Sequence, residues 1–390
     1  MENLEATCRM CGAAGLEEIS GFSRLSRVTS DCKPFPAGGR LAVCSVCGGL
    51  QKFVDAQWLD EIRRIYADYD MYHQSTEVDQ VVMDPATGAL RPRGAVLASR
   101  LADVPEFPET GRWLDIGAGR GAMLRAVSNL DRGWQLHACD LDDRYRETLN
   151  GIPGFVELYC GGLEATIGTF DIVSMIHSLE HFVEPLGVLV AARHRLNAGG
   201  SLFVQVNDTG AYPFDMVVAD HLTHFTPETL ASMVVHAGYR VVNLATDWVT
   251  KEISLTARVE ASASSTHPTA NSRAVVPAVR REIDWLDRVA QAAQDAAAAG
   301  PIGMFGSAIA GTWLAGLLGD RVAFFVDEDR TRLERQHLGK PILAPDQVPS
   351  GDTVFIGLTP ATAMRIYQRL ERLPVRFCLP PPLEPANDAT

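Results

Sequence analysis

The sequence predicts an α/β protein in three parts: a cysteine-rich N-terminal module, a central Rossmann-like domain and a smaller C-terminal Rossmann-like lobe. Three observations predict this arrangement. Two Cys-x-x-Cys motifs occur near the N-terminus, an apolar strand pattern runs into a glycine loop, and strand and helix patterns alternate on both sides of a linker. With 390 residues the chain is long enough for two or three domains.

Composition restricts the class of protein. Hydrophobic residues make up 46% of the chain and charged residues 21%, as in a globular protein, and no apolar run reaches the roughly 18 residues that span a bilayer. The acidic N-terminus lacks the pattern of a secretory signal, so we expect no membrane partner and a cytoplasmic location with reduced cysteines. The net charge of −13 argues against nucleic acid as a partner. A local basic excess within 21–54 suits an anionic small molecule or is simply a solvated face, and it comprises Arg24, Arg27, Lys33, Arg40 and Lys52.

The first module, residues 1–54, has the ligand pattern of a structural zinc site. Each Cys-x-x-Cys motif places two sulfurs on one side of a tight turn, and two motifs complete a tetrahedral set of four thiolates. The ligands are Cys8, Cys11, Cys44 and Cys47. Cys32 lies between the motifs without a partner at this spacing, so we leave it out. The alternative is a pair of metal-free turns.

Residues 55–110 form a connector. Apolar positions at helical spacing predict a helix over 55–69, and a tyrosine-rich stretch follows over 66–75. This stretch is either a helix end with half-buried aromatic rings or a lid whose phenols face a substrate. The lid interpretation makes Tyr72 a candidate site residue.

Residues 111–257 predict a parallel sheet with helical crossovers. A buried strand over 113–116 ends in glycines at alternate positions, and a helix follows at 122–127. Further strands are predicted at 134–139, 170–176, 201–207, 239–244 and 252–257, with helices over 185–196 and 226–238. The glycine loop alone is also compatible with a nicotinamide-binding fold.

A linker and a long helix are predicted for 258–300, with the helix over 277–298. The last part, residues 301–390, repeats the alternating pattern: strands at 302–306, 322–327, 353–358 and 375–379 and a helix at 308–318. Gly306 and Asp327 raise the alternative of a nicotinamide site in this lobe, although the glycine spacing does not match the dinucleotide motif.

The central domain resembles class I S-adenosylmethionine (SAM) methyltransferases. The resemblance is carried by the glycine loop after Asp115, by Asp140 at the end of the second strand, and by the stretch His177-Ser-Leu-Glu-His-Phe182. It implies that Asp115 and the loop hold the methionine end of SAM and that Asp140 holds the ribose hydroxyls. The implied SAM-binding residues are Asp115, Gly117, Ala118, Gly119, Asp140, Leu141, Gly162, Leu163, Ile176 and His177.

The whole pattern resembles the zinc-containing sugar C-methyltransferases, which act on nucleotide-linked deoxysugars. The second cysteine motif and the C-terminal glycine turn at 306–312 carry this resemblance. It implies a base that removes a proton next to a keto group, and an enolate that attacks the SAM methyl group. The implied catalytic residues are His224 as base, His181 and His221 as groups that polarise or protonate the acceptor, and Tyr72.

The chain departs from that family where Thr223 replaces a glutamate and His221 replaces a tyrosine. The departure leaves carbon, oxygen and nitrogen open as the methylated atom. An O- or N-methyltransferase on another small molecule is therefore the alternative, and a non-catalytic protein that binds zinc and nucleotide is a third. His221 and His224 have a spacing that zinc ligands use, but the sequence offers no third ligand nearby, so no second metal is predicted.

Overall fold

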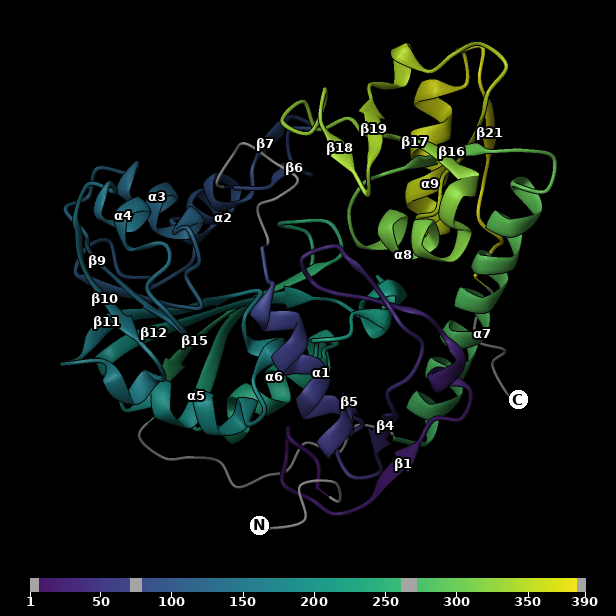
Figure 1. The fold of residues 1–390 in the computed structure, drawn as a ribbon. Helices are drawn as coiled ribbons and strands as arrows, with labels where there is room; N and C mark the ends of the chain where they lie inside the picture. Colours follow the sequence, from purple (N-terminus) through teal and green to yellow (C-terminus); the bar gives the residue numbers. More distant parts are fainter. Residues whose placement is uncertain (1–6, 71–78, 261–271, 384–390) are drawn as a thin grey trace.

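The computed structural model describes residues 7–70, 79–260 and 272–383. Its central sheet lies between two helical layers, and a second sheet forms a separate lobe joined to it by one long helix (Figure 1). None of the helices in the described ranges is long and apolar enough to cross a membrane.

The central sheet has seven strands, of which six run in the same direction and one, β15, runs opposite to them. In spatial order they are β10 (Phe155–Cys160), β9 (Gln135–Asp140), β8 (Arg112–Ile116), β11 (Phe170–Ile176), β12 (Leu196–Asn207), β15 (Glu252–Val259) and β14 (Tyr239–Ala245). Strand β15 runs antiparallel between β12 and β14. All of the strands predicted for this domain are present, and β10 is an additional one. The carboxyl ends of the parallel strands therefore meet at one edge, where open α/β sheets bind ligands.

Helices cover both faces of this sheet (Figure 1). They are α2 (Arg93–Leu101), α3 (Ala122–Ser128), α4 (Arg146–Asn150), α5 (Pro185–Arg193) and α6 (Pro227–His236). Helix α6 begins as predicted, because the Thr226 side chain accepts from the backbone N–H of Thr229 in a reciprocal capping box.

Helix α5 ends earlier than predicted. It stops at Arg193, and β12 already begins at Leu196, which pairs with Phe170 of β11. The residues predicted to end the helix form a bulge in the strand instead, because the pairing jumps from Leu196 to Ser201. Asn197 holds the bulge by donating to Asp171 at 2.8 Å.

The N-terminal module shares a sheet with the central domain. The sheet order is β1 (Leu16–Glu18), β4 (Leu41–Cys44), β5 (Leu50–Lys52) and β13 (Thr223–His224), and β13 comes from the central domain. A small hairpin of β2 (Arg27–Val28) and β3 (Pro34–Phe35) packs against the C-terminal lobe. The module therefore has no hydrophobic core separate from its neighbours.

Three of the five basic residues of this module, Arg24, Lys33 and Arg40, remain partly exposed. Each side chain has an acidic or carbonyl partner, and two of the five are fully buried. The partners are Asp287 for Arg24, Glu61 for Arg27, Asp31 for Lys33, Glu18 for Arg40, and the Val218 and His221 carbonyls for Lys52. Binding of an anionic small molecule by this face stays a prediction.

The connector contains α1 (Ala56–Ala67) and a hairpin of β6 (Val81–Met83) and β7 (Leu90–Pro92). Asp55 caps α1 by accepting from the backbone N–H of Trp58 at 2.7 Å. Tyr72 lies outside the described residues.

The long helix α7 (Ser272–Ala296) begins before its predicted start at residue 277 and leads into the C-terminal lobe. The lobe's sheet has the order β18 (Gln336–His337), β19 (Lys340–Leu343), β17 (Val322–Val326), β16 (Ile302–Phe305), β20 (Thr353–Phe355) and β21 (Arg376–Cys378). All except β18 are parallel, and α8 (Ile309–Leu318) and α9 (Pro360–Leu370) accompany them.

Candidate active site

The glycine loop connects β8 to α3 with a left-handed backbone. The φ values are 76° at Gly117, 52° at Gly119 and 78° at Gly121. A Cβ at Gly117 would lie 2.6 Å from Ser178 Cβ, so only glycine fits there. The loop therefore brings the backbone of β8 close to the segment that follows β11.

Asp140 ties this loop to the neighbouring strand. It ends β9, where its Oδ2 accepts from the backbone N–H of Gly119 at 2.8 Å and its Oδ1 accepts from that of Leu141 at 2.7 Å. These contacts orient the carboxylate at the carboxyl edge of the sheet.

Asp115 is buried beside this loop. Its Oδ1 accepts from Ser174 Oγ at 2.6 Å. The pKa of Asp115 is raised to about 7. Burial is the main cause, the hydrogen bond from Ser174 opposes it, and the negative charge of Asp140 adds to it. A cation bound at this edge would favour the ionised form of Asp115.

The remaining residues predicted to bind SAM lie at the same edge. Gly162 and Leu163 follow β10, while Ile176 ends β11 and His177 comes next with φ of 48°. The structure therefore brings the ends of β8, β9, β10 and β11 together around one region.

The predicted catalytic histidines gather beside this region on a shared carboxylate. Asp215, in the 3₁₀ turn η4 (Pro213–Val217), places Oδ1 2.8 Å from His221 Nδ1 and Oδ2 2.7 Å from His224 Nδ1. Asn207 and Thr209 also donate to Asp215. The carboxylate is buried and held from four directions, so both imidazole rings are fixed.

The pKa values of the two histidines shift in opposite directions although both rings contact the same carboxylate. Burial and the ammonium group of Lys52 lower the pKa of His224 to about 4, despite Asp215. Burial also opposes the charged form of His221, but the Asp215 carboxylate raises the pKa of His221 above its ordinary value. Paired groups with pKa values pushed apart are typical of acid and base assignments. Near neutral pH His224 is therefore a neutral imidazole.

His181 completes the group. It ends the 3₁₀ turn η3 (Leu179–His181), and its ring lies edge-on to His221 with centroids 4.7 Å apart. Its Nδ1 lies 3.0 Å from Tyr66 Oη and 3.1 Å from the Asp220 carbonyl oxygen. The connector thus brings the Tyr66 phenol to the site, a contact that the sequence analysis did not identify.

A row of charged side chains joins the two regions. Arg93 pairs with Glu252 at 2.9 Å, and His177 places Nε2 3.2 Å from Glu252 and Nδ1 3.3 Å from Glu180. Burial alone would lower the pKa of His177, but Glu252 and Glu180 raise it above its ordinary value. His177 thus connects the end of β11 to the histidine group.

Sequence reasoning assigned no role to several polar residues of this site: Glu180, Asp215, Asp220 and Glu252. It placed Tyr66 within the possible lid of residues 66–75, without its contact to His181. Glu180 lies inside the His177–Phe182 stretch, so its position there was the available signal. Asp215 lies in a short 3₁₀ turn with no motif around it, and only the fold brings it to His224.

The four cysteines of the N-terminal motifs lie together, with sulfurs within 4.8 Å of one another. Cys8 and Cys47 have sulfurs 3.5 Å apart, and those of Cys11 and Cys44 are 3.8 Å apart. Tetrahedral zinc with bonds of about 2.3 Å places its sulfurs about 3.8 Å apart. This group could hold a metal ion.

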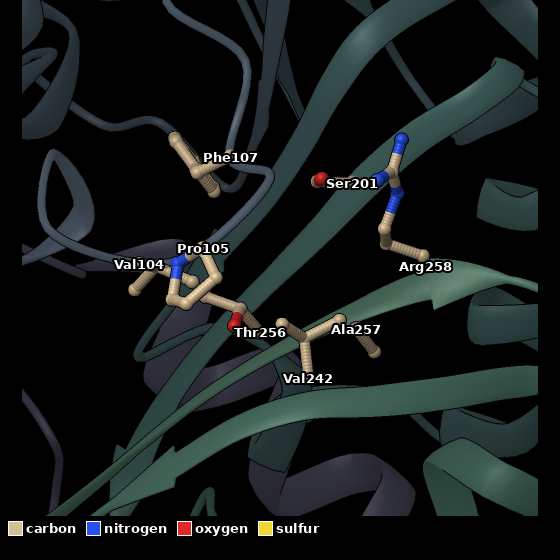
Figure 2. A pocket seen from close by; sticks show the side chains of 8 residues that line it. All are labelled: Val104, Pro105, Phe107, Ser201, Val242, Thr256, Ala257 and Arg258. Carbon is tan, nitrogen blue, oxygen red and sulfur yellow. The ribbon is translucent and has the colours of Figure 1, made fainter.

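A shallow recess lies on the amino-end side of the central sheet (Figure 2). It encloses almost no space, so it does not have the size of a ligand pocket. It lies between the loop after α2 and the starts of β12 and β14, and its lining comprises Val104, Pro105, Phe107, Ser201, Val242, Thr256, Ala257 and Arg258. This recess is not the candidate active site.

Comparison with known proteins identifies the domain. Residues 90–244 match the family model described as "Methyltransferase domain". A curated relative, ubiquinone biosynthesis O-methyltransferase of Vibrio cholerae, is 29% identical over 132 residues, which are 30% of this chain and 51% of the relative. The chain thus spans about half the length of the curated relatives it matches.

Solved structures that match part of this chain include an O-methyltransferase family protein from Burkholderia thailandensis, at 19% identity and a TM-score of 0.37 over 42% of this chain and 55% of that one. Human N-acetylserotonin methyltransferase has 17% identity and a TM-score of 0.36 over 43% of this chain and 51% of that one.

The strand order, the glycine loop and the family match show that the chain contains a class I SAM-dependent methyltransferase domain. This confirms the broader of the two resemblances. The finer resemblance, to sugar C-methyltransferases, stays a prediction.

Proposed function

We propose that the protein is an enzyme that transfers a methyl group from SAM to a small polar acceptor after removing a proton from that acceptor. The observation that carries the proposal is the Asp215–His224 pair. His224 Nδ1 is held at 2.7 Å, and its Nε2 is buried with no hydrogen-bond partner in the described part of the chain. A neutral, oriented imidazole of this kind is suited to act as a general base.

The residues at the sheet edge fit SAM. Asp140 keeps acceptor capacity beyond its two backbone partners, which suits the ribose hydroxyls. Asp115 is buried and short of partners for a carboxylate, which suits the cationic methionine end. When bound, SAM supplies an electrophilic methyl group on its sulfonium.

The three histidines have different roles in proton removal and charge stabilisation. His224 Nε2 takes the proton from an acceptor C–H beside a keto group, or from a hydroxyl. The Asp215 carboxylate favours the protonated form of His221, and in that form His221, together with His181, stabilises the negative charge that develops on the acceptor oxygen. The proton then leaves His224 to solvent after methyl transfer.

A nucleotide-linked keto sugar is our leading acceptor, on the resemblance of the cysteine motifs and the C-terminal glycine turn to sugar C-methyltransferases. An oxygen acceptor is the second candidate. The match to a ubiquinone biosynthesis O-methyltransferase supports it, and so does the replacement of the family's glutamate by Thr223.

We also propose that Cys8, Cys11, Cys44 and Cys47 hold one structural zinc ion. Backbone N–H groups point at three of the sulfurs at 3.4 Å, from Met10 to Cys8, Val46 to Cys44 and Gly49 to Cys47. Such bonds support thiolates in the turns that bind zinc. Four thiolates leave no position for a substrate.

The test is a product screen with nucleotide-linked keto sugars and phenolic acceptors, followed by mass spectrometry. A second readout is deuterium uptake from heavy water at the carbon beside the keto group, in the absence of SAM. We expect His224→Asn to abolish this uptake and the surface variant His194→Asn to retain it. Methylation of a hydroxyl with no deuterium uptake would assign the second candidate, and no methylation of any acceptor would refute the proposal.

A further inference from the structure

Three side chains beside His224 form a group with the composition of a metal site. Glu180, His181 and His221 each offer one ligand atom, and these atoms lie within 4.8 Å of one another. We propose that they bind a divalent transition-metal ion and leave a coordination position open for an oxygen of the acceptor. Two histidines and one carboxylate form known zinc and non-haem iron centres. The site is distinct from the four cysteines, and of the His221 and His224 pair considered in the sequence it uses His221 alone.

The contacts of the two Nδ1 atoms, on His221 and His181, support this assignment. His221 Nδ1 lies 2.8 Å from the Asp215 carboxylate, and His181 Nδ1 lies 3.1 Å from the Asp220 carbonyl oxygen. These contacts leave Nε2 of each ring as the ligand atom. Histidines that bind metals characteristically donate their other N–H to a carboxylate or a carbonyl, which fixes the ring and its tautomer.

Glu180 provides an independent observation. Only 2% of this residue is exposed, and neither carboxylate oxygen has a hydrogen-bond partner within the described ranges. Its nearest charged contact is His177 Nδ1, 3.3 Å from Oε1. A buried carboxylate without hydrogen bonds is costly, and a cation between Glu180 and the two imidazoles would compensate it.

The surrounding charge also favours a cation. Glu180, Asp215 and Asp220 are three buried carboxylates around the two histidines. Lys52 directs its ammonium group to the backbone carbonyls of Val218 and His221 instead of to these acids. A metal bound about 2.0–2.2 Å from each ligand needs ligand atoms about 3–4 Å apart, so movements of less than about 2 Å complete the set.

Metal binding does not rest on the proposed function, but its effect on catalysis does. Metal binding requires the neutral form of His221, so with the ion bound the ion would replace charged His221 in stabilising the acceptor. As the acceptor proton passes to His224 Nε2, the electron pair left on the acceptor gives a negative oxygen, which the metal ion would stabilise. The new bond then forms between the acceptor and the SAM methyl group while the carbon–sulfur bond breaks, and S-adenosylhomocysteine leaves.

The experiment measures zinc per chain. The full-length protein is saturated with Zn²⁺, desalted and analysed by elemental mass spectrometry. We expect two zinc ions in the wild type, and one in Glu180→Gln and in His221→Asn, in which asparagine keeps a donor for Asp215. The surface variant His194→Asn is the matched control and should retain both. Circular dichroism and SAM affinity show whether each variant is folded, and His181→Asn serves if either is not.

Cobalt spectra separate the two sites. With Co²⁺ the cysteine site should show thiolate charge-transfer absorption, and the second site only ligand-field bands, which His221→Asn should remove. One zinc in the wild type, or a second zinc retained in both variants, would overturn the metal site. Full turnover without the second metal would overturn its catalytic role and leave the methyltransferase proposal intact. A second metal in a protein that methylates no acceptor would support the site and refute the proposed function.

Discussion

His224 Nδ1 lies 2.7 Å from Asp215 Oδ2, and the other oxygen of the same carboxylate lies 2.8 Å from His221 Nδ1. One buried acid therefore orients two imidazoles of different pKa. Because the pKa of His224 is lowered to about 4, its Nε2 is unprotonated across the physiological range, and it is a weaker base than an ordinary imidazole. Asp215 thus acts on the reaction through His224 and His221.

Asp215→Asn should lower turnover by roughly 10²- to 10⁴-fold, because an amide can donate to His224 Nδ1 and so favours the wrong tautomer. SAM affinity, measured by calorimetry, should change less than about threefold, because Asp215 is not among the residues predicted to bind SAM. Asp142→Asn, at an exposed acid paired with Arg144, is the control. Unchanged turnover in Asp215→Asn would show that Asp215 does not position the base.

His224→Asn and His181→Asn should differ when compared side by side. Loss of the base should lower turnover by roughly 10²- to 10⁴-fold at nearly constant SAM affinity. His181→Asn should reduce turnover less, because His181 acts on the developing charge. Retained turnover in both variants would move the role of base elsewhere and favour an oxygen acceptor methylated mainly by proximity.

Asp140→Ala should weaken SAM binding. It removes the proposed ribose acceptor and the partner of the Gly119 and Leu141 backbone N–H groups. Loss of such partners costs about 1–3 kcal/mol per group, or roughly 5- to 150-fold in dissociation constant. Calorimetry with Asp143→Ala as an exposed control measures this, and equal affinity for both variants would mean that the SAM site has been misplaced.

The sequence predicted the strand and helix pattern of the central domain and the glycine loop because these depend on local chemistry: apolar runs, glycine and capping residues. It also predicted the cysteine motifs, whose sulfurs the fold brings together. It did not predict Asp215 beside His224, or Tyr66 beside His181, because these contacts join segments that have no shared motif. The predicted end of α5 was wrong, because the pairing of β12 with β11 determines where the helix stops, and that pairing joins segments distant in sequence.

SAM affinity should depend on pH through Asp115. The pKa of this acid is raised to about 7, and the SAM amino group is cationic below about pH 7.7. The dissociation constant should therefore fall as the pH rises from about 5.5 to about 7.5, as Asp115 ionises. The sign is opposite for the protein without SAM. Its stability should fall as the pH rises between 3.8 and about 7, because Asp115 ionises in the unfolded chain while the buried acid in the folded protein still keeps its proton.

Calorimetry across this pH range, together with thermal melts, measures both effects. Asp115→Asn should bind SAM more weakly and show little pH dependence. A pH-independent dissociation constant in the wild type would mean that Asp115 does not meet the cationic end of SAM.

Loss of the proposed zinc ion should displace His224, because the pairing of β13 with β5 connects this residue to the cysteine turns. His224 pairs with Leu50, and Thr223 pairs with Gln51, in a two-residue ladder between β13 and β5. Strand β5 begins three residues after Cys47, so the cysteine turn fixes its start. Cys44→Ser should therefore lose the zinc ion and lower turnover by at least about tenfold, because His224 is no longer held in register. SAM affinity should stay within about threefold of the wild type, since the glycine loop lies on another sheet.

Cys160→Ser is the matched control, because Cys160 is exposed and lies outside the cysteine group. Elemental analysis, turnover and SAM calorimetry on the two variants make the comparison. If Cys44→Ser loses zinc and keeps full turnover, the N-terminal module does not position His224. If it loses SAM binding as well, the module supports the whole central domain and not the base alone.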